Sequence, residues 1–249
     1  MIFPTDKSSL GSWLCSKSPI VAELMAICGF DFLTIDAEHS PIDVEGSLGI
    51  LQAIRSGNRN CKALVRVSGN SYSEIKRYMD AGADGIICPM VNSADDARTL
   101  VNAVKYPSLG QRGVGFSRSN NYGLNLQDAV ENDNQRTFVC VQIEHIDAVN
   151  NLKEILAIEG VDAAIIGPYD LSASMGIVGE LNHPKMEEAI AFTLKTCIEM
   201  GVLPGIHVVQ PDVQQINARI TQGYKFIACS VDITMISVTA TKLLTELKS

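Results

Sequence analysis

Polar side chains that could do chemistry follow four short apolar runs of the chain. They lie in the segments Ile35–His39, Val65–Val67, Gln142–His145 and Gly167–Ser172. Together these segments supply carboxylates, a histidine base and a guanidinium group. In an α/β barrel, catalytic groups come from the C-terminal ends of several strands. If the four apolar runs are strands of one barrel, their polar ends meet at one site.

Glu144 and Asp170 are two carboxylates at neighbouring strand ends. Carboxylate oxygens, completed by water and substrate, suit Mg²⁺ or Mn²⁺. Gln142 lies two residues before Glu144, so both side chains point to the same face of the strand. Two other interpretations stay open: Glu144 as a solvated or ion-paired strand end, and Asp170 as the N-cap of a helix beginning at Leu171.

Arg66 lies inside an otherwise apolar strand, and a buried arginine needs a partner. That partner is either an anionic ligand held by the guanidinium group or the acid of a structural ion pair. His39, which follows Asp36, is a candidate general base, although a single surface histidine is a weak signal. The direction of His207 within its strand cannot be fixed. His145 and His183 look like helix-start residues.

A Schiff-base aldolase would need a desolvated lysine near a strand end. Lys62 and Lys225 come just before their strands, and Lys105 follows a helix. Because no strand interior carries a lysine, the task of stabilising a carbanion shifts to a metal.

The elements that must position these residues alternate between short apolar runs and segments of helical period. The expected strands are Gly11–Leu14, Phe30–Asp36, Ala63–Val67, Gly85–Val91, Phe138–Glu144, Ala163–Pro168, Leu203–Val209 and Phe226–Val231. The expected helices are Pro19–Cys28, Asp43–Ser56, Ser71–Ala81, Ser93–Val104, His145–Ile158, Pro184–Met200, Pro211–Gln222 and Ile236–Leu247.

About eight strand–helix units in 249 residues predict an α/β protein with a single (β/α)8 TIM barrel and one domain over residues 1–249. An open doubly wound sheet is the alternative, but no GxGxxG motif follows an early strand. The phrase Gly-x-Asp recurs from Gly29, Gly82 and Gly160 and marks helix-to-strand corners. The irregular stretch Pro107–Gln127 is long enough to suggest a functional loop.

Composition limits the classes of protein to which the chain can belong. Hydrophobic residues make up 46% and charged residues 19%, and the formal net charge is −8, which argues against nucleic-acid binding. Seven cysteines without a CxxC pair are typical of free thiols in a reducing compartment. With no signal peptide and no membrane span evident, we expect a soluble cytoplasmic protein.

The chain resembles the HpcH/HpaI family of class II pyruvate aldolases, which act on 4-hydroxy-2-oxo acids. The matching stretches follow one another along nearly the whole chain. They are Gly29–His39, Val65–Val67, Tyr78–Ala83, Pro89–Val91, Tyr106–Pro107, Gly110–Gly115, Gln142–Glu144 and Ile166–Ser172.

The resemblance implies that Glu144 and Asp170 bind a divalent metal (Mg²⁺, Mn²⁺ or Co²⁺) that chelates pyruvate. Arg66 would stabilise charge on the keto oxygen. His39 would be the base, with Asp36 beside it among the catalytic residues. These implied roles extend to the substrate contacts Gln142, Gly167, Tyr169 and Asp170.

The family also implies a homo-oligomer, with a hexamer expected. Asp80 would raise the basicity of the histidine, reaching a neighbouring subunit's site because it lies at a helix end far from its own barrel mouth.

The implied reaction is reversible cleavage of a substrate such as 4-hydroxy-2-oxoheptanedioate or a 2-dehydro-3-deoxy sugar acid to pyruvate and an aldehyde. Alternatives are oxaloacetate decarboxylation, cleavage of a malyl-type thioester, and a non-catalytic barrel that binds a small acid. Three departures from the family pattern leave the aldehyde open: Tyr169 in place of a small residue, His207, and the tail Ser230–Ile233.

Overall fold

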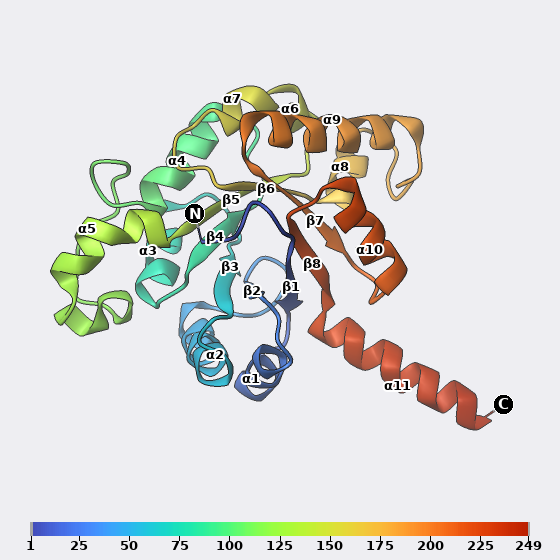
Figure 1. Ribbon diagram of the computed structural model, residues 1–249, viewed down its shortest axis with the longest axis horizontal. Helices are drawn as coiled ribbons and strands as arrows, with labels where there is room; N and C mark the ends of the chain where they lie inside the picture. Colours follow the sequence, from blue (N-terminus) through green and yellow to red (C-terminus); the bar gives the residue numbers. More distant parts are fainter. Residues whose placement is uncertain (1, 249) are drawn as a thin grey trace.

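Eight parallel strands close into a barrel in the computed structural model, which describes residues 2–248 (Figure 1). Each strand pairs with its neighbours in chain order, and β8 closes on β1. The strands are β1 (Ser9–Leu14), β2 (Phe32–Asp36), β3 (Lys62–Arg66), β4 (Gly85–Cys88), β5 (Phe138–Ile143), β6 (Ala163–Ile166), β7 (Leu203–Val208) and β8 (Phe226–Val231). The predicted (β/α)8 TIM barrel is confirmed.

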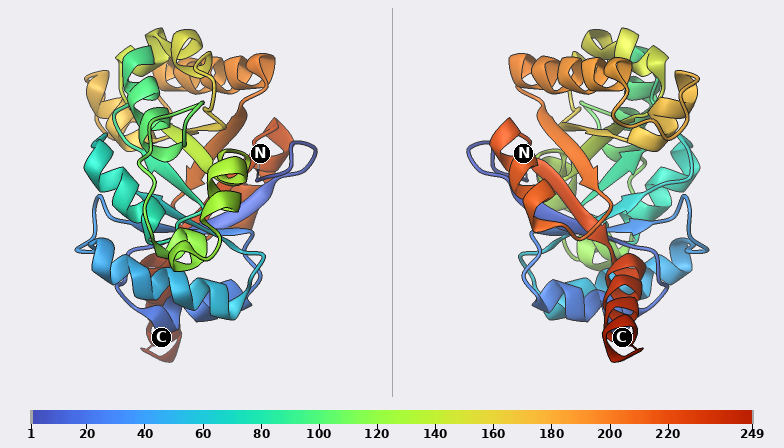
Figure 2. Two further views of the ribbon diagram at one scale, coloured as in Figure 1. Left: turned by 90° about the vertical axis from the view of Figure 1, so that its left-hand side faces the viewer. Right: turned by 90° about the vertical axis from the view of Figure 1, so that its right-hand side faces the viewer.

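Helices follow the strands and surround most of the barrel (Figures 1 and 2). They are α1 (Pro19–Ile27), α2 (Val44–Gly57), α3 (Tyr72–Asp80), α4 (Ala94–Val104), the 3₁₀ turn η1 (Arg118–Gly123), α5 (Leu126–Arg136), α6 (Ile146–Asn150), α7 (Leu152–Leu156), α8 (Pro168–Ser174), α9 (Pro184–Met200), α10 (Val213–Gln222) and α11 (Asp232–Lys248). All eight helices predicted from the sequence are present, one of them as the pair α6 and α7.

The core has two layers, one inside the barrel and one between the strands and the helices. Four phenylalanines fill the inner layer, and Phe32 stacks on Phe226 with 4.2 Å between ring centroids. Phe3 and Phe138 complete this aromatic group. The outer layer is aliphatic and fully buried along the helix-facing sides of the strands. A filled barrel is a rigid frame, so the strand ends that carry the polar residues are held in fixed positions.

The repeated Gly-x-Asp phrases lie at three equivalent corners. Each glycine is in the left-handed region, with φ of 98°, 98° and 99° at Gly29, Gly82 and Gly160. The aspartate that follows accepts a hydrogen bond from a backbone N–H of the preceding strand. The donors are Leu10 for Asp31 at 2.8 Å, Ala63 for Asp84 at 2.7 Å and Val139 for Asp162 at 2.9 Å. The predicted corners are confirmed, and each aspartate ties adjacent strands together.

Two elements differ from the sequence prediction. The stretch Pro107–Gln127 contains η1 and leads into α5, a helix that the sequence did not predict because it is polar and buries only Ala129. Arg118 of η1 donates to the carbonyl of Ala81, just before β4, whereas the N–H of Gly113 earlier in the loop donates to the hydroxyl of Tyr72 at the start of α3. The predicted helix His145–Ile158 is broken at Asn151, which caps both α6 and α7.

The last helix, α11, extends away from the barrel (Figures 1 and 2). It contacts its own chain mainly at β1 and β8, and only Asp232 at its start is buried. Among residues 2–248, no helix combines the length and the apolar character needed to cross a membrane.

Candidate active site

A cavity of about 260 Å³ opens at the C-terminal ends of the strands. Its wall contains most of the residues that the sequence singled out, namely His39, Arg66, Gln142, Gly167, Tyr169 and Asp170, together with Trp13 and His207. These residues come from the ends of six different strands. The barrel therefore brings together side chains that are up to 194 positions apart in the chain, from Trp13 to His207.

Arg66 is the best-fixed side chain in this wall. Its Nε lies 3.0 Å from Asp36 Oδ1 and one terminal nitrogen lies 2.9 Å from Oδ2, which makes a bidentate pair. The other terminal nitrogen lies 3.0 Å from Glu38 Oε2. The guanidinium carbon is 4.2 Å from the centre of the Trp13 ring. Arg66 thus forms a structural ion pair, which confirms that interpretation, and it also lines the cavity, so the binding of an anionic ligand stays a prediction.

The two acids beside Arg66 differ in their electrostatics. Burial alone would raise the pKa of Asp36, but the hydrogen bonds and charge of Arg66 and the N–H groups of His39 and Glu38 hold that pKa below its ordinary value. Burial raises the pKa of Glu38, opposed by Arg66 and reinforced by the charge of Glu144. Asp36 is therefore an anion that holds Arg66 in one orientation, and its place among the catalytic residues stays a prediction.

Glu144, directly after β5, is 3% exposed and is held by two donors. Its Oε1 accepts a 2.7 Å hydrogen bond from the N–H of Met90, and its Oε2 contacts the side-chain nitrogen of Gln142. Met90 has φ of 54°, a strained value for a non-glycine residue, and this conformation aims its N–H at the carboxylate. Gly167 packs closely here, since a Cβ at its position would lie 3.1 Å from Glu144 Oε2.

Asp170 lies in the first turn of α8 and is exposed. The N-cap of this helix is Gly167 and its first residue is Pro168, so the interpretation of Asp170 as an N-cap is wrong. Proline at the start of the helix sets the boundary earlier than the sequence suggested. Within residues 2–248 the Asp170 carboxylate has no hydrogen-bond or ion-pair partner, which leaves its oxygens available to a ligand.

The chemistry of these donors fits a hard divalent cation. Glu144 and Asp170 offer carboxylate oxygens, and within residues 2–248 each Glu144 oxygen accepts one hydrogen bond, so lone pairs remain. No cluster of three or more His, Cys, Asp or Glu ligands occurs within residues 2–248. The remaining ligands must then come from water or substrate, which is the usual arrangement for Mg²⁺.

His39 and Asp80 lie in different parts of the chain's structure, since His39 lines the cavity and Asp80 does not. The His39 side chain is 65% exposed at the cavity rim, with its Nε2 3.8 Å from Glu38 Oε2. Asp80 ends α3 and pairs with the buried Arg112 at 2.8 Å. It does not line the cavity of its own chain. This position agrees with the expectation that Asp80 is far from its own barrel mouth, and its reach into a neighbouring subunit stays a prediction.

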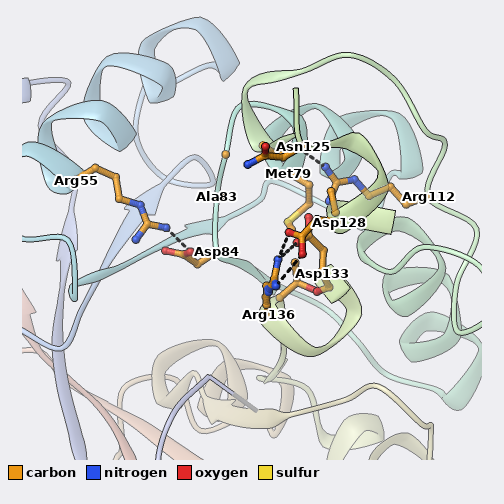
Figure 3. Close-up of a pocket in the computed structure, with 13 residues that line it drawn as sticks. Arg55, Met79, Ala83, Asp84, Arg112, Asn125, Asp128, Asp133 and Arg136 are labelled. Carbon is orange, nitrogen blue, oxygen red and sulfur yellow. Dashed lines mark hydrogen bonds and ion pairs between the residues drawn. The ribbon is translucent and has the colours of Figure 1, made fainter. Parts of the chain in front are cut away.

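A second hollow of about 270 Å³ lies at the opposite end of the barrel (Figure 3). Arg55 faces Asp84, and Arg136 faces Asp128 and Asp133, so these charges satisfy one another. Arg112 also points into this region and is paired with Asp80. With its charges paired, this hollow offers fewer free groups for chemistry than the cavity at the strand ends.

Several features of the site were missed or left open by the sequence. Trp13, Glu38 and the N–H of Met90 were not singled out, and the position of a tryptophan in the first strand was the only signal for Trp13. His207 points into the barrel mouth and lines the cavity, which settles its direction. His145 and His183 cap α6 and α9, as predicted.

The lysines lie where the sequence placed them. Lys62 is the first residue of β3, and Lys225 directly precedes β8. Lys105 is buried behind α4, where its Nζ donates to the carbonyls of Asn134 and Thr137. Among the described residues, the cavity lining contains no lysine.

Comparison with known proteins gives consistent matches. Residues 9–238 match the family model described as HpcH/HpaI aldolase/citrate lyase. A 4-hydroxy-2-oxo-heptane-1,7-dioate aldolase of Escherichia coli is 39% identical over 93% of this chain and 87% of its own length. A hydroxypyruvate/pyruvate aldolase of Sagittula stellata is 38% identical over 93% of this chain and 90% of its own length.

A solved structure of an HpcH/HpaI aldolase/citrate lyase family protein from Burkholderia cenocepacia superposes with a TM-score of 0.94. It is 32% identical and covers 100% of this chain and 97% of its own.

Proposed function

The chain belongs to the HpcH/HpaI aldolase/citrate lyase family, and from this premise we propose that it reversibly cleaves a 4-hydroxy-2-oxo acid to pyruvate and an aldehyde with the help of a divalent metal. The description of the family names aldolases and citrate lyases, which are carbon–carbon lyases. The observation that carries the proposal is the cavity where Arg66, Gln142 and Asp170 meet beside the buried carboxylate of Glu144. 4-Hydroxy-2-oxoheptanedioate and 2-dehydro-3-deoxy sugar acids are the candidate substrates.

Glu144 and Asp170 would hold the metal, for which Mg²⁺, Mn²⁺ and Co²⁺ are the candidates. When bound, the ion supplies a Lewis acid for the carboxylate and 2-keto oxygens of the substrate. The N–H of Met90 and the Gln142 amide hold the Glu144 carboxylate in one orientation for this task.

Arg66 would stabilise the negative charge that grows on the keto oxygen during cleavage. The bidentate pair with Asp36 and the stacking on Trp13 fix its guanidinium group before substrate arrives. A donor that is already oriented requires no rearrangement in the transition state, and this is the largest source of rate enhancement in many enzymes. Gln142, Gly167 and the N–H of Tyr169 would contact the substrate from the β5 and β6 side.

His39 would act as the base. In cleavage it accepts the proton of the C4 hydroxyl, the C3–C4 bond breaks, and the aldehyde leaves. The electron pair of that bond remains on the pyruvate enolate, whose oxygen faces Arg66. Protonation of the enolate at C3 then gives pyruvate. The exposed position of His39 at the rim leaves room for this transfer.

We also propose that the enzyme is a homo-oligomer. The apolar side chains of α11 are exposed, among them Ile236, Leu243 and Leu247. Between α1 and α10 the outside of β1 and β8 has a hollow of about 430 Å³ whose lining includes Leu10, Phe30 and Ile216. A second copy would bury both surfaces, and the family resemblance leads us to expect a hexamer.

The substrate class is tested by measuring pyruvate release in the presence of Mn²⁺ or Mg²⁺. The panel contains several 4-hydroxy-2-oxo acids and oxaloacetate, and a malyl thioester is assayed separately by release of glyoxylate, because its cleavage gives no pyruvate. Release from a 4-hydroxy-2-oxo acid with an equal amount of aldehyde supports the proposal. Turnover of oxaloacetate alone would replace it with a decarboxylase. The thioester is disfavoured because Arg66 is the only Lys or Arg in the cavity lining among the described residues, and Arg66 is already paired.

A further inference from the structure

His207 is a cavity-lining residue that none of the proposed roles uses. It lies near the end of β7 and faces the barrel mouth, in the same wall as Gly167 and Asp170. Its ring stacks on Trp13, with 5.3 Å between ring centroids and 27° between the planes. Trp13 in turn lies against Arg66. The stack holds the imidazole in one orientation at the place where substrate would enter.

One hydrogen bond of the His207 ring defines its tautomer, which means the ring nitrogen that carries the proton. Nε2 lies 3.3 Å from the carbonyl oxygen of Ser230, and a carbonyl only accepts, so Nε2 carries the proton. Ser230 has φ of 62°, and its carbonyl oxygen also accepts from Ser12 Oγ at 3.1 Å. The carbonyl oxygen of Ser230 thus has two hydrogen-bond partners, and its position beside Nε2 makes that nitrogen the donor.

The other ring nitrogen is an acceptor without a donor. In a neutral imidazole with the proton on Nε2, Nδ1 has a free lone pair. Among residues 2–248 no donor bonds to Nδ1. Burial, followed by the positive charge of Arg66, lowers the pKa of His207 from its ordinary value of 6.5 to about 4, against the opposing effects of the Ser230 carbonyl and Asp36. The imidazole is therefore neutral near pH 7.

We propose that Nδ1 of His207 accepts a hydrogen bond from a hydroxyl group of the substrate, so that His207 makes the enzyme prefer hydroxylated substrates. The inference rests on the proposed aldolase function and adds a preferred substrate class to it. A carboxylate cannot fill this position, because it has no proton to donate to a neutral nitrogen. The hydroxyl group has two sources: the aldehyde, as in glycolaldehyde, or the 2-oxo acid released, as in hydroxypyruvate.

The test compares three substrates with Mn²⁺ present. 4-Hydroxy-2-oxopentanoate gives pyruvate and acetaldehyde and lacks the extra hydroxyl. 4,5-Dihydroxy-2-oxopentanoate gives pyruvate and glycolaldehyde. 3,4-Dihydroxy-2-oxopentanoate gives hydroxypyruvate and acetaldehyde. The full-length wild-type protein is compared with His207→Leu, which removes the acceptor, and with His207→Asn, whose amide oxygen takes the place of Nδ1. His183→Leu is the matched control, because His183 caps α9 outside the cavity.

We expect His207→Leu to lower kcat/KM by about 10- to 100-fold for one hydroxylated substrate and by less than about threefold for 4-hydroxy-2-oxopentanoate, since a buried hydroxyl without a partner is costly. The substrate that loses activity identifies the source of the hydroxyl. His207→Asn should keep most of the preference, and His183→Leu all of it.

An equal effect of His207→Leu on all three substrates would overturn this inference and leave the aldolase function standing. A wild-type enzyme that releases no product from these three substrates but cleaves 4-hydroxy-2-oxoheptanedioate would overturn this inference alone, and one that cleaves none of the four would contradict the aldolase function as well.

Discussion

Arg66 is a charged residue in an apolar strand for which the sequence left two interpretations open. A guanidinium group in an apolar strand suggested either an ion pair or an anion site, and the structure shows a bidentate pair with Asp36 in a cavity wall. Asp36 and Glu38 together compensate the charge of Arg66 and leave one face of the group toward the cavity. The ion pair is therefore compatible with the proposed function of Arg66, because it can hold the guanidinium group in position at the cavity wall.

Replacing Arg66 with lysine tests this view. Lysine keeps the positive charge but cannot form the bidentate pair or stack in the same way on Trp13. We expect Arg66→Lys to lower kcat by about 100- to 1,000-fold, the range found when one oriented oxyanion donor is removed. Steady-state kinetics measures the effect, with thermal unfolding as a control for folding. A kcat within threefold of wild type would show that Arg66 is structural only.

His207 makes the stability of the protein depend on pH. Its pKa is about 4 in the folded protein and 6.5 ordinarily, so the unfolded chain binds a proton more readily between these values. The contribution of His207 to the free energy of unfolding is complete above about pH 6.5 and is lost as the pH falls toward 4. It amounts to about 3 kcal/mol, at about 1.4 kcal/mol for each pH unit.

Urea unfolding at several pH values measures this contribution. His207→Leu should lose less stability than wild type between pH 6.5 and 4, and parallel curves would contradict the assignment.

The sequence located most of the candidate residues because strand ends and residue types are local signals. It could not give the partners of those residues, which come from distant segments. Met90 donates to Glu144 across 54 positions, and Trp13 meets His207 only when the barrel closes. The direction of His207 was open for the same reason, because the side of a strand that faces inward is set by its pairing with its neighbours.

The aspartates of the Gly-x-Asp corners stabilise the barrel by tying adjacent strands together. The Asp162 carboxylate accepts from Val139 N–H and lies 3.7 Å from the buried Lys105 Nζ. Among the described residues, the exposed Asp31 carboxylate has only the hydrogen bond from Leu10 N–H. We expect Asp162→Ala to lower the free energy of unfolding by about 3 kcal/mol, because a buried charge loses its partner. Asp31→Ala should cost about 1 kcal/mol. Chemical denaturation checks both values, and equal losses would contradict the role given to Lys105.

Elements were predicted well where apolar periodicity was strong. All eight strands lie within a few residues of the predicted bounds. The helix α5 was missed because its sequence, LQDAVENDNQR, has no apolar stripe, and its position depends on contacts with η1 and the loop before it. The break between α6 and α7 follows from Asn151, a residue that favours caps over helix interiors.

Among the described residues, α11 contacts its own chain mainly at β1 and β8, and most of its length is exposed. If the exposed side of α11 is an interface, Leu243→Glu combined with Leu247→Glu should shift the protein from an oligomer to a monomer. Thr245→Glu adds a charge on the opposite side of the same helix and should leave the oligomer intact. Light scattering coupled to size-exclusion chromatography measures the mass. A wild-type monomer would contradict the proposed assembly.

The organisation of the chain as one domain over residues 1–249 stays a proposal. The closed barrel could be predicted from the alternation of strands and helices, since connections of this kind have few compatible topologies. The outward direction of α11 could not be predicted, because an apolar helix pattern does not say which copy of the chain it packs against.

The most direct test of the account measures pyruvate release from 4-hydroxy-2-oxoheptanedioate after treatment with EDTA and again after addition of Mn²⁺. We predict that EDTA abolishes release and that Mn²⁺ restores it. Glu144→Ala should remain inactive with Mn²⁺, while Glu154→Ala, an exposed carboxylate on α7, behaves as wild type. Activity that survives EDTA, or that persists in Glu144→Ala, would contradict the metal-dependent mechanism.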